Sequence, residues 1–115
     1  CYPEYHTSLD DLSFVTPDGL TGGYEVIKKA IECIEINEKL RTTILCEPQL
    51  GKRGLYPNIS TKDTVAQVRD MMNVLVYSDG ELSTLDIAEK INVPLWRLSG
   101  IIGSLKDQGI LISVD

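Results

Sequence analysis

The second half of the chain constrains the fold most strongly, because helix-capping signals follow one another there in a regular order. Asp63 can cap a helix whose apolar residues recur every three or four positions. Ser83 and Asp86 have the spacing of a capping box, which predicts a second helix. Pro94 suits the first position of a third helix, and Gly109 suits its C-terminal cap. Three short helices are therefore predicted.

The apolar residues of these helices form stripes that predict a shared core. The stripes are Val65, Val68, Met72 and Leu75 in the first helix, Leu85, Ile87, Ala88 and Ile91 in the second, and Leu95, Leu98, Ile102 and Leu105 in the third. A strand is predicted over residues 110–114. Helix, helix, turn, helix and strand is the order of a winged helix-turn-helix domain, which we place at residues 62–115. The wing is expected to lack its second strand, since the sequence stops there.

The first half predicts one long helix between irregular segments. Thr16 and Pro17 have the order of an N-cap and a first helical residue, and the helix is expected to continue to about Lys39. Residues 1–15 are interpreted as a short strand leading into a loop. Residues 46–60 contain two prolines and two glycines and predict a loop or short hairpin. The apolar stripe of the helix is Leu20, Tyr24, Ile27, Ile31 and Ile34.

Composition and charge limit the classes of function. The 115 residues are 43% hydrophobic and 24% charged, which is typical of a globular domain. The formal net charge is −6, and acidic residues outnumber basic ones in both halves, so a nucleic-acid partner is not favoured. No apolar run reaches the roughly 18 residues of a membrane span. Without a signal-peptide pattern, we expect a soluble, cytoplasmic protein with no membrane partner.

The third predicted helix has an unusual exposed side. Gly100 and Gly103 each cost about 1 kcal/mol relative to alanine inside a helix, and Trp96 precedes them at helical spacing. One interpretation is a docking face formed by these three residues, which would allow a homo-oligomer. The other is a slightly weak helix with no partner, and the sequence favours neither. Because few cations accompany Arg97, this helix is a poor reader of DNA bases.

Three segments carry a resemblance to a known family. They are residues 3–12 (PEYHTSLDDL), residues 46–57 (CEPQLGKRGLYP), and residues 78–80 (SDG) with 85–88 (LDIA). Together they resemble the C-terminal part of the aminopeptidase-like family often labelled polysaccharide-biosynthesis proteins. The resemblance implies an α+β, mainly α chain. Residues 1–61 would be an incomplete strand-loop-helix end-piece of an α/β phosphorylase/hydrolase-like aminopeptidase domain, followed by the winged helix.

The resemblance also implies one metal ligand. The His-Thr-Ser segment of that family supplies a histidine to a zinc site, and this role corresponds to His6, the only histidine of the chain. A neutral imidazole is a good zinc ligand. The remaining ligands and the catalytic base would lie upstream, so no catalytic residue is expected in this fragment. Zinc and a peptide or amide substrate are expected for the complete protein, and no bound metal is expected for the fragment alone. Asp10 and Asp11 are interpreted as caps or solvated charges.

Two further residues are candidates for substrate binding. Arg53 has the geometry to hold a substrate carboxylate with two hydrogen bonds, and Tyr56 lies nearby in sequence. The alternative is a tight turn that presents solvated cations. Two other hypotheses remain for the whole chain: a free-standing winged-helix regulator that binds DNA, and a protein-interaction module. A start at Cys1 rather than methionine suggests a fragment.

Overall fold

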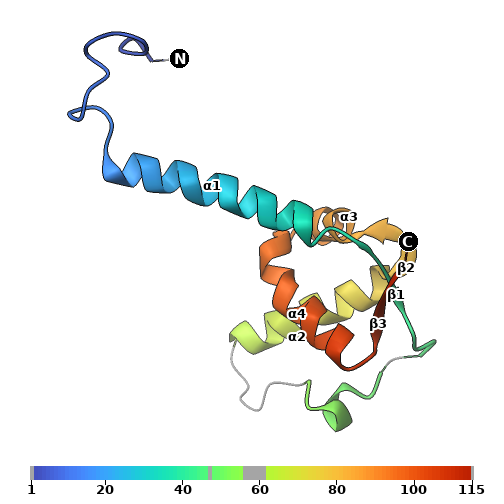
Figure 1. Cartoon of the computed structure of the whole chain (residues 1–115). Helices are drawn as coiled ribbons and strands as arrows, with labels where there is room; N and C mark the ends of the chain where they lie inside the picture. Colours follow the sequence, from blue (N-terminus) through green and yellow to red (C-terminus); the bar gives the residue numbers. More distant parts are fainter. Residues whose placement is uncertain (1, 47, 56–61, 115) are drawn as a thin grey trace. The chain divides into compact units, whose positions relative to one another are not determined.

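The computed structural model describes residues 2–46, 48–55 and 62–114. The described residues form two compact units, one ending at Glu32 and one beginning at Cys33. In chain order the elements are α1 (Pro17–Glu35), β1 (Lys39–Thr42), the 3₁₀ turn η1 (Leu50–Arg53), α2 (Lys62–Tyr77), β2 (Asp79–Ser83), α3 (Thr84–Ile91), α4 (Leu95–Asp107) and β3 (Leu111–Val114) (Figure 1).

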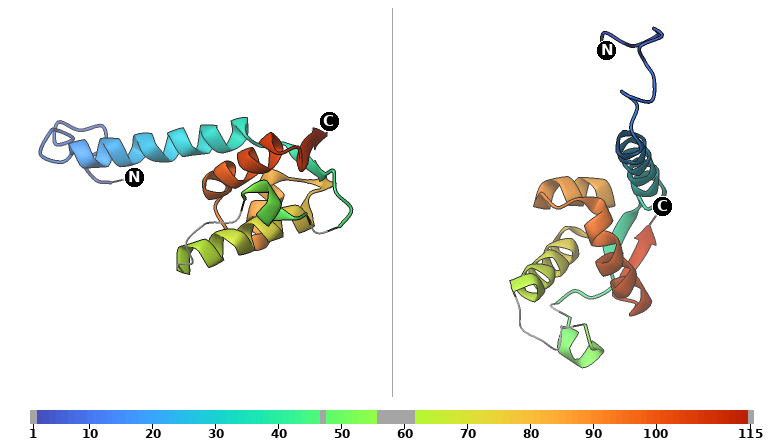
Figure 2. Two further views of the ribbon diagram at one scale, coloured as in Figure 1. Left: turned by 90° about the horizontal axis from the view of Figure 1, so that it is seen from below. Right: turned by 90° about the vertical axis from the view of Figure 1, so that its left-hand side faces the viewer.

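Helix α1 begins where its capping signal predicts. The backbone N–H of Gly19 donates to the Thr16 hydroxyl at 3.1 Å, which satisfies one of the free donors of the first turn. The helix runs without a break to Glu35 (Figure 2). The expected end near Lys39 is wrong, because Lys39 is instead the first residue of β1. None of the 19 residues of α1 is buried.

The segment before α1 consists of turns. Backbone N–H groups at Tyr5, Thr7 and Asp10 each donate to a carbonyl three residues earlier. The short strand expected in residues 1–15 is therefore wrong for the described residues 2–15, which contain no strand. Local hydrogen bonds of this kind compete with strand formation when no neighbouring strand is available.

The middle strand of the sheet, β1, precedes helices α2, α3 and α4 in the sequence. Its order is β2-β1-β3, and both pairings are antiparallel. Leu40 faces Ser113 in the register, and Thr42 faces Leu111. The partner of the last strand, β3, is β1, whose residues lie about 70 positions earlier in the sequence. β1 is short and has only one fully buried side chain, Leu40, which explains why its sequence gave no strand signal.

The predicted ends of α3 and α4 are confirmed closely, whereas Asp63 does not precede α2 as a cap, because α2 begins at Lys62. The Ser83 hydroxyl accepts from the Asp86 N–H at 3.2 Å, and Asp86 accepts from the Ser83 N–H at 2.9 Å, which is the reciprocal pair of a capping box. α4 begins one residue after Pro94. Gly109 follows α4 with φ of 65°, a left-handed value that glycine adopts without strain.

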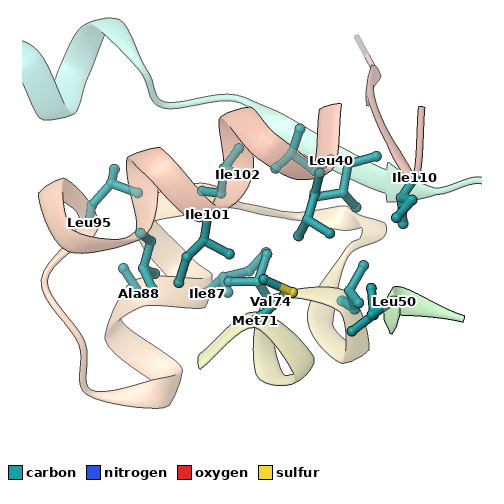
Figure 3. Close-up of a cluster of buried hydrophobic side chains, with 14 residues drawn as sticks. Leu40, Leu50, Met71, Val74, Ile87, Ala88, Leu95, Ile101, Ile102 and Ile110 are labelled. Carbon is teal, nitrogen blue, oxygen red and sulfur yellow. The ribbon is translucent and has the colours of Figure 1, made fainter. Parts of the chain in front are cut away.

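A single hydrophobic core lies between the helices and the sheet of the second unit (Figure 3). Burial of each large aliphatic side chain contributes roughly 1.5–3 kcal/mol. All four predicted core residues of α4 are buried. The members of the core are Leu40, Leu50, Met71, Val74, Leu75, Ile87, Ala88, Leu95, Leu98, Ile101, Ile102, Leu105, Ile110 and Leu111.

The predicted stripe of α2 is partly wrong. Val65 is 65% exposed, whereas Met71 and Val74 are buried. The buried side of α2 is thus rotated from the predicted one, and the rotation carries Asp70 into the interior.

The α+β, mainly helical fold class is confirmed. The expected division into residues 1–61 and 62–115 concerns the domains of a longer protein and stays a prediction. Within the described chain, β1 and Leu50 belong to the same unit as α2, α3 and α4. None of the helices in the described ranges has the length and apolar character needed to cross a membrane.

Candidate functional site

His6 projects from a tight turn in the first unit. The N–H and the hydroxyl of Thr7 both donate to the Glu4 carbonyl, at 2.9 and 2.7 Å, and close the turn around His6. His6 itself has φ of 62°, a left-handed conformation that is uncommon outside glycine. Its exposed ring contacts the Tyr5 ring edge-to-face, with centroids 4.1 Å apart. The turn therefore presents the imidazole to the surroundings.

The acidic residues near His6 are used by other partners. Asp10 accepts from the Tyr2 hydroxyl at 2.9 and 3.0 Å, and this hydrogen bond raises the pKa of Tyr2. Asp11 accepts from the hydroxyl and the N–H of Ser13 at 2.6 and 2.8 Å, and these bonds hold the pKa of Asp11 below its usual value. Asp11 thus caps a local turn, in agreement with its interpretation as a cap or solvated charge, whereas Asp10 is the exposed hydrogen-bond partner of a tyrosine eight residues away.

His6 by itself does not make a metal centre. Across the residues with described positions, no three His, Cys, Asp or Glu side chains lie close enough together to hold one ion. A zinc site in proteins normally has three or four protein ligands. Within the part of the chain that the structure describes, His6 therefore does not belong to a set of three potential metal ligands.

Arg53 is held at the end of α4. It ends the turn η1, and its Nη1 donates to the carbonyl of Gln108 at 3.1 Å. A cation suits this position, since the last carbonyls of a helix carry partial negative charge. The structure thus gives Arg53 a capping role, and its substrate role stays a prediction. Tyr56 lies outside the described residues.

Trp96, Gly100 and Gly103 share the exposed side of α4, as their spacing of four and three residues predicts. Each borders a different hollow. Trp96, 48% exposed, lines an open groove of about 440 Å³ with the α3–α4 turn. Gly103 lines a pocket of about 280 Å³ that also includes Glu38 and Lys106. Gly100 lines a pocket of about 290 Å³ between α2 and α4.

The pocket beside Gly100 contains a residue that sequence reasoning missed. Asp70 is only 6% exposed and lines this pocket. Its Oδ1 is the buried side-chain oxygen that, within the described residues, has no hydrogen-bond partner. Arg69 Nε lies 3.6 Å from it, but the Arg69 side chain is 70% exposed. The sequence carries no signal for its burial, because the predicted apolar stripe of this helix did not include the neighbouring Met71 and Val74.

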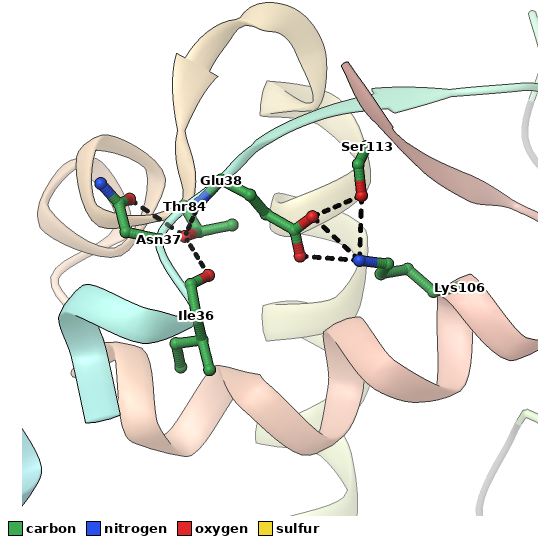
Figure 4. A network of polar contacts seen from close by, with 6 residues as sticks. All are labelled: Ile36, Asn37, Glu38, Thr84, Lys106 and Ser113. Carbon is green, nitrogen blue, oxygen red and sulfur yellow. Dashed lines mark hydrogen bonds and ion pairs between the residues drawn. The ribbon is translucent and has the colours of Figure 1, made fainter. Parts of the chain in front are cut away.

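A polar cluster ties the end of α4 to the start of β1 (Figure 4). Lys106 Nζ contacts both carboxylate oxygens of Glu38, at 2.8 and 2.9 Å, and the Ser113 hydroxyl also donates to Glu38. Desolvation raises the pKa of Glu38, but the hydrogen bonds from Lys106 and Ser113 outweigh it and leave the pKa lowered.

Comparison with known families divides the chain close to the end of α1. Residues 38–113 match the model of a winged helix-turn-helix family. Residues 1–37 match a domain of unknown function, DUF4910.

Two similar proteins come from Clostridium acetobutylicum. One, provisionally named a polysaccharide biosynthesis protein with an aminopeptidase-like domain, is 42% identical over 96 residues, which are 82% of this chain and 22% of that protein. The other is a crystal structure provisionally named a peptidase, with 34% identity and a TM-score of 0.80 over 98% of this chain and 24% of its own. The predicted resemblance is confirmed, and the chain spans about a quarter or less of these relatives.

Proposed function

This chain belongs to the winged helix-turn-helix family, and from that premise we propose that it serves as the C-terminal segment of a longer, zinc-dependent aminopeptidase-like hydrolase. The observation that carries the proposal is the 42% identity with a protein named for its aminopeptidase-like domain. The segment itself would not hydrolyse a substrate, since its described residues include no group of three potential metal ligands.

The exposed apolar side of α1 supports the proposal that this helix packs within a larger domain. Its five stripe residues are between 51 and 71% exposed. An amphipathic helix gains most of its stability by burying such a stripe. We propose that the aminopeptidase-like part of the longer protein covers this side. The match of residues 1–37 to a separate family model agrees with that division.

His6 would be one ligand of the metal site. Left-handed backbone costs a non-glycine residue about 1–3 kcal/mol, and such strain persists at positions where a function needs it. The exposed imidazole at the tip of the Glu4–Thr7 turn is free of hydrogen bonds to Asp10 and Asp11, whose contacts lie elsewhere. When bound, zinc would supply a Lewis acid and an activated water. The substrate class expected for the longer protein is a peptide or amide.

The winged helix would serve packing or assembly rather than DNA recognition. The net charge of −6 opposes binding to phosphates. The exposed side of α4 carries Trp96 and two glycines, which offer an apolar anchor and close backbone approach instead of base-reading side chains.

The metal proposal is tested in the longer protein. We expect the purified longer protein to contain at least about one equivalent of zinc. The His6→Ala variant should contain at least one metal ion fewer and should lose its peptidase activity. Asp11→Asn is the matched control, because Asp11 bonds Ser13 and should retain metal. The isolated 115-residue chain should bind no zinc tightly. A metal-free longer protein, or a His6→Ala variant with full metal content, would contradict the proposal.

A further inference from the structure

The pocket between α2 and α4 contains a carboxylate oxygen that accepts no hydrogen bond from the described residues, although the exposed Arg69 side chain lies 3.6 Å from it. Asp70 Oδ1 is buried without a hydrogen bond and lies in the wall of a pocket of about 290 Å³, together with Gln67, Arg97, Gly100 and Ile101. Buried carboxylates are costly unless donors surround them, and the great majority of buried polar atoms have a partner. A donor that enters this pocket would meet the oxygen directly.

Glycine at position 100 leaves space in the pocket, although the packing of the helices does not require a glycine there. A Cβ added at this position would meet nothing within 4 Å, so neighbouring groups do not require glycine. Alanine would also be the better helix former. The space beside Gly100 is therefore available to a ligand, and a methyl group there would reduce it.

The two charges of the pocket define the ligand class. Asp70 calls for a cationic donor, while Arg97, exposed on the same pocket wall, repels a ligand that carries positive charge alone. A ligand with both an ammonium and a carboxylate group suits both residues. The volume is close to the lower end of the roughly 300–1,000 Å³ that is usual for small-molecule sites.

We infer that this pocket binds a small zwitterion with the chemistry of a free α-amino acid. Its ammonium group donates to Asp70 Oδ1, its carboxylate faces Arg97, and its side chain lies against Ile101. The inference is independent of the metal proposal, because every residue involved belongs to α2 or α4.

Binding is measured with three matched probes on the 115-residue chain. The amide resonances of Asp70 and Gly100 are followed by NMR during titration with L-leucine, with 3-methylbutylamine, which lacks the carboxylate, and with 4-methylpentanoate, which lacks the ammonium. We expect saturable shifts with leucine and affinities at least about tenfold weaker for the other two, since each loses one charged contact.

Variants locate the site. Asp70→Asn should weaken leucine binding about tenfold or more while the melting temperature stays equal or rises, because the unsatisfied charge is removed. Asp107→Asn removes the same charge from an exposed position of α4 outside the pocket and should bind normally. Gly100→Ala and Gly103→Ala should both raise the melting temperature, but only Gly100→Ala should weaken binding. Arg97→Gln should remove the preference for leucine over the amine.

Several results would overturn the inference. They are the absence of saturable shifts with leucine, unchanged leucine binding by Asp70→Asn or by Gly100→Ala, and equal affinity for 3-methylbutylamine in the unmodified chain. A lower melting temperature in Asp70→Asn would also overturn it, because the ion pair with Arg69 at 3.6 Å would then already stabilise the carboxylate.

Discussion

Helices α1 and α4 are both amphipathic, yet only α4 has its apolar side covered. α4 buries five of 13 residues against α2, α3 and β3, whereas α1 buries none of 19. The spacing of apolar residues thus specifies a stripe on each helix, but the stabilisation depends on which neighbours are present. We expect the residues of the packed unit to control its unfolding, and the stripe of α1 to matter only when a partner covers it.

Truncating one buried and one exposed aliphatic side chain tests this contrast, and the buried truncation should have the largest effect on stability. Leu98 is fully buried on α4, so Leu98→Ala should lower the free energy of unfolding by about 2–5 kcal/mol. Ile31 on α1 is 51% exposed, and Ile31→Ala should change it by less than about 0.5 kcal/mol in the 115-residue chain. Urea unfolding followed by circular dichroism measures both. Equal losses would show that α1 is covered within this chain.

The segment that follows α1, residues 36–38, is held by a buried hydroxyl group. Thr84 is fully buried, and its Oγ1 donates toward the Ile36 carbonyl at 3.1 Å and accepts from the Glu38 N–H at 3.3 Å (Figure 4). Thr84→Val keeps the shape but leaves these groups without a partner, and should cost about 1–3 kcal/mol. Thr84→Ser retains the hydroxyl and serves as the control. A neutral valine variant would mean that residues 36–38 are anchored by other contacts.

Two matched N-caps sharpen the comparison further. Ser83→Ala and Thr16→Ala each remove a side-chain acceptor from a helix start, at a cost of about 1 kcal/mol. The Ser83 variant should lower the urea midpoint of the cooperative transition, because α3 is part of the packed unit. The Thr16 variant should reduce helical ellipticity near the start of α1 and leave that midpoint in place. A shifted midpoint in both variants would merge the two regions into one cooperative unit.

The smallest expected effect is a pH dependence of the free energy of unfolding that comes from Glu38. The pKa of Glu38 is lowered below 4.5 in the folded chain, so its ionised form adds stability that is lost as the pH falls through the folded pKa. The loss between about pH 6 and pH 3 should be below about 1 kcal/mol, since the Glu38–Lys106 pair is partly exposed. Glu38→Gln should flatten this part of the stability profile. An identical acid profile in the variant would exclude Glu38 as a contributor.

Local signals predicted the helices well because capping is local. The capping box at Ser83 and the left-handed Gly109 each involve residues within one helical turn, so the sequence contains the whole interaction. Strand β1 could not be predicted in the same way. Its partners lie about 40 and 70 residues away, and a four-residue strand has too few side chains for a clear alternation.

The candidate site was less predictable than the fold. His6 and the glycines of α4 follow from motifs and spacing, but the pocket beside Gly100 depends on how α2 is rotated. That rotation is set by packing of Met71 and Val74 against the other helices, and a polar residue such as Asp70 gives no periodic signal of burial. Arg53 was identified by residue type, whereas its partner, the Gln108 carbonyl, belongs to a distant helix end.

The position of β1 in the sheet has a mechanical consequence. Only three residues, Ile36 to Glu38, connect α1 to the central strand, which is hydrogen-bonded on both sides. Lys39, the first residue of β1, pairs with Val114, the last residue of β3. Tension applied between the N-terminal side of β1 and the end of β3 would therefore act on the same end of this ladder and separate its pairs one after another.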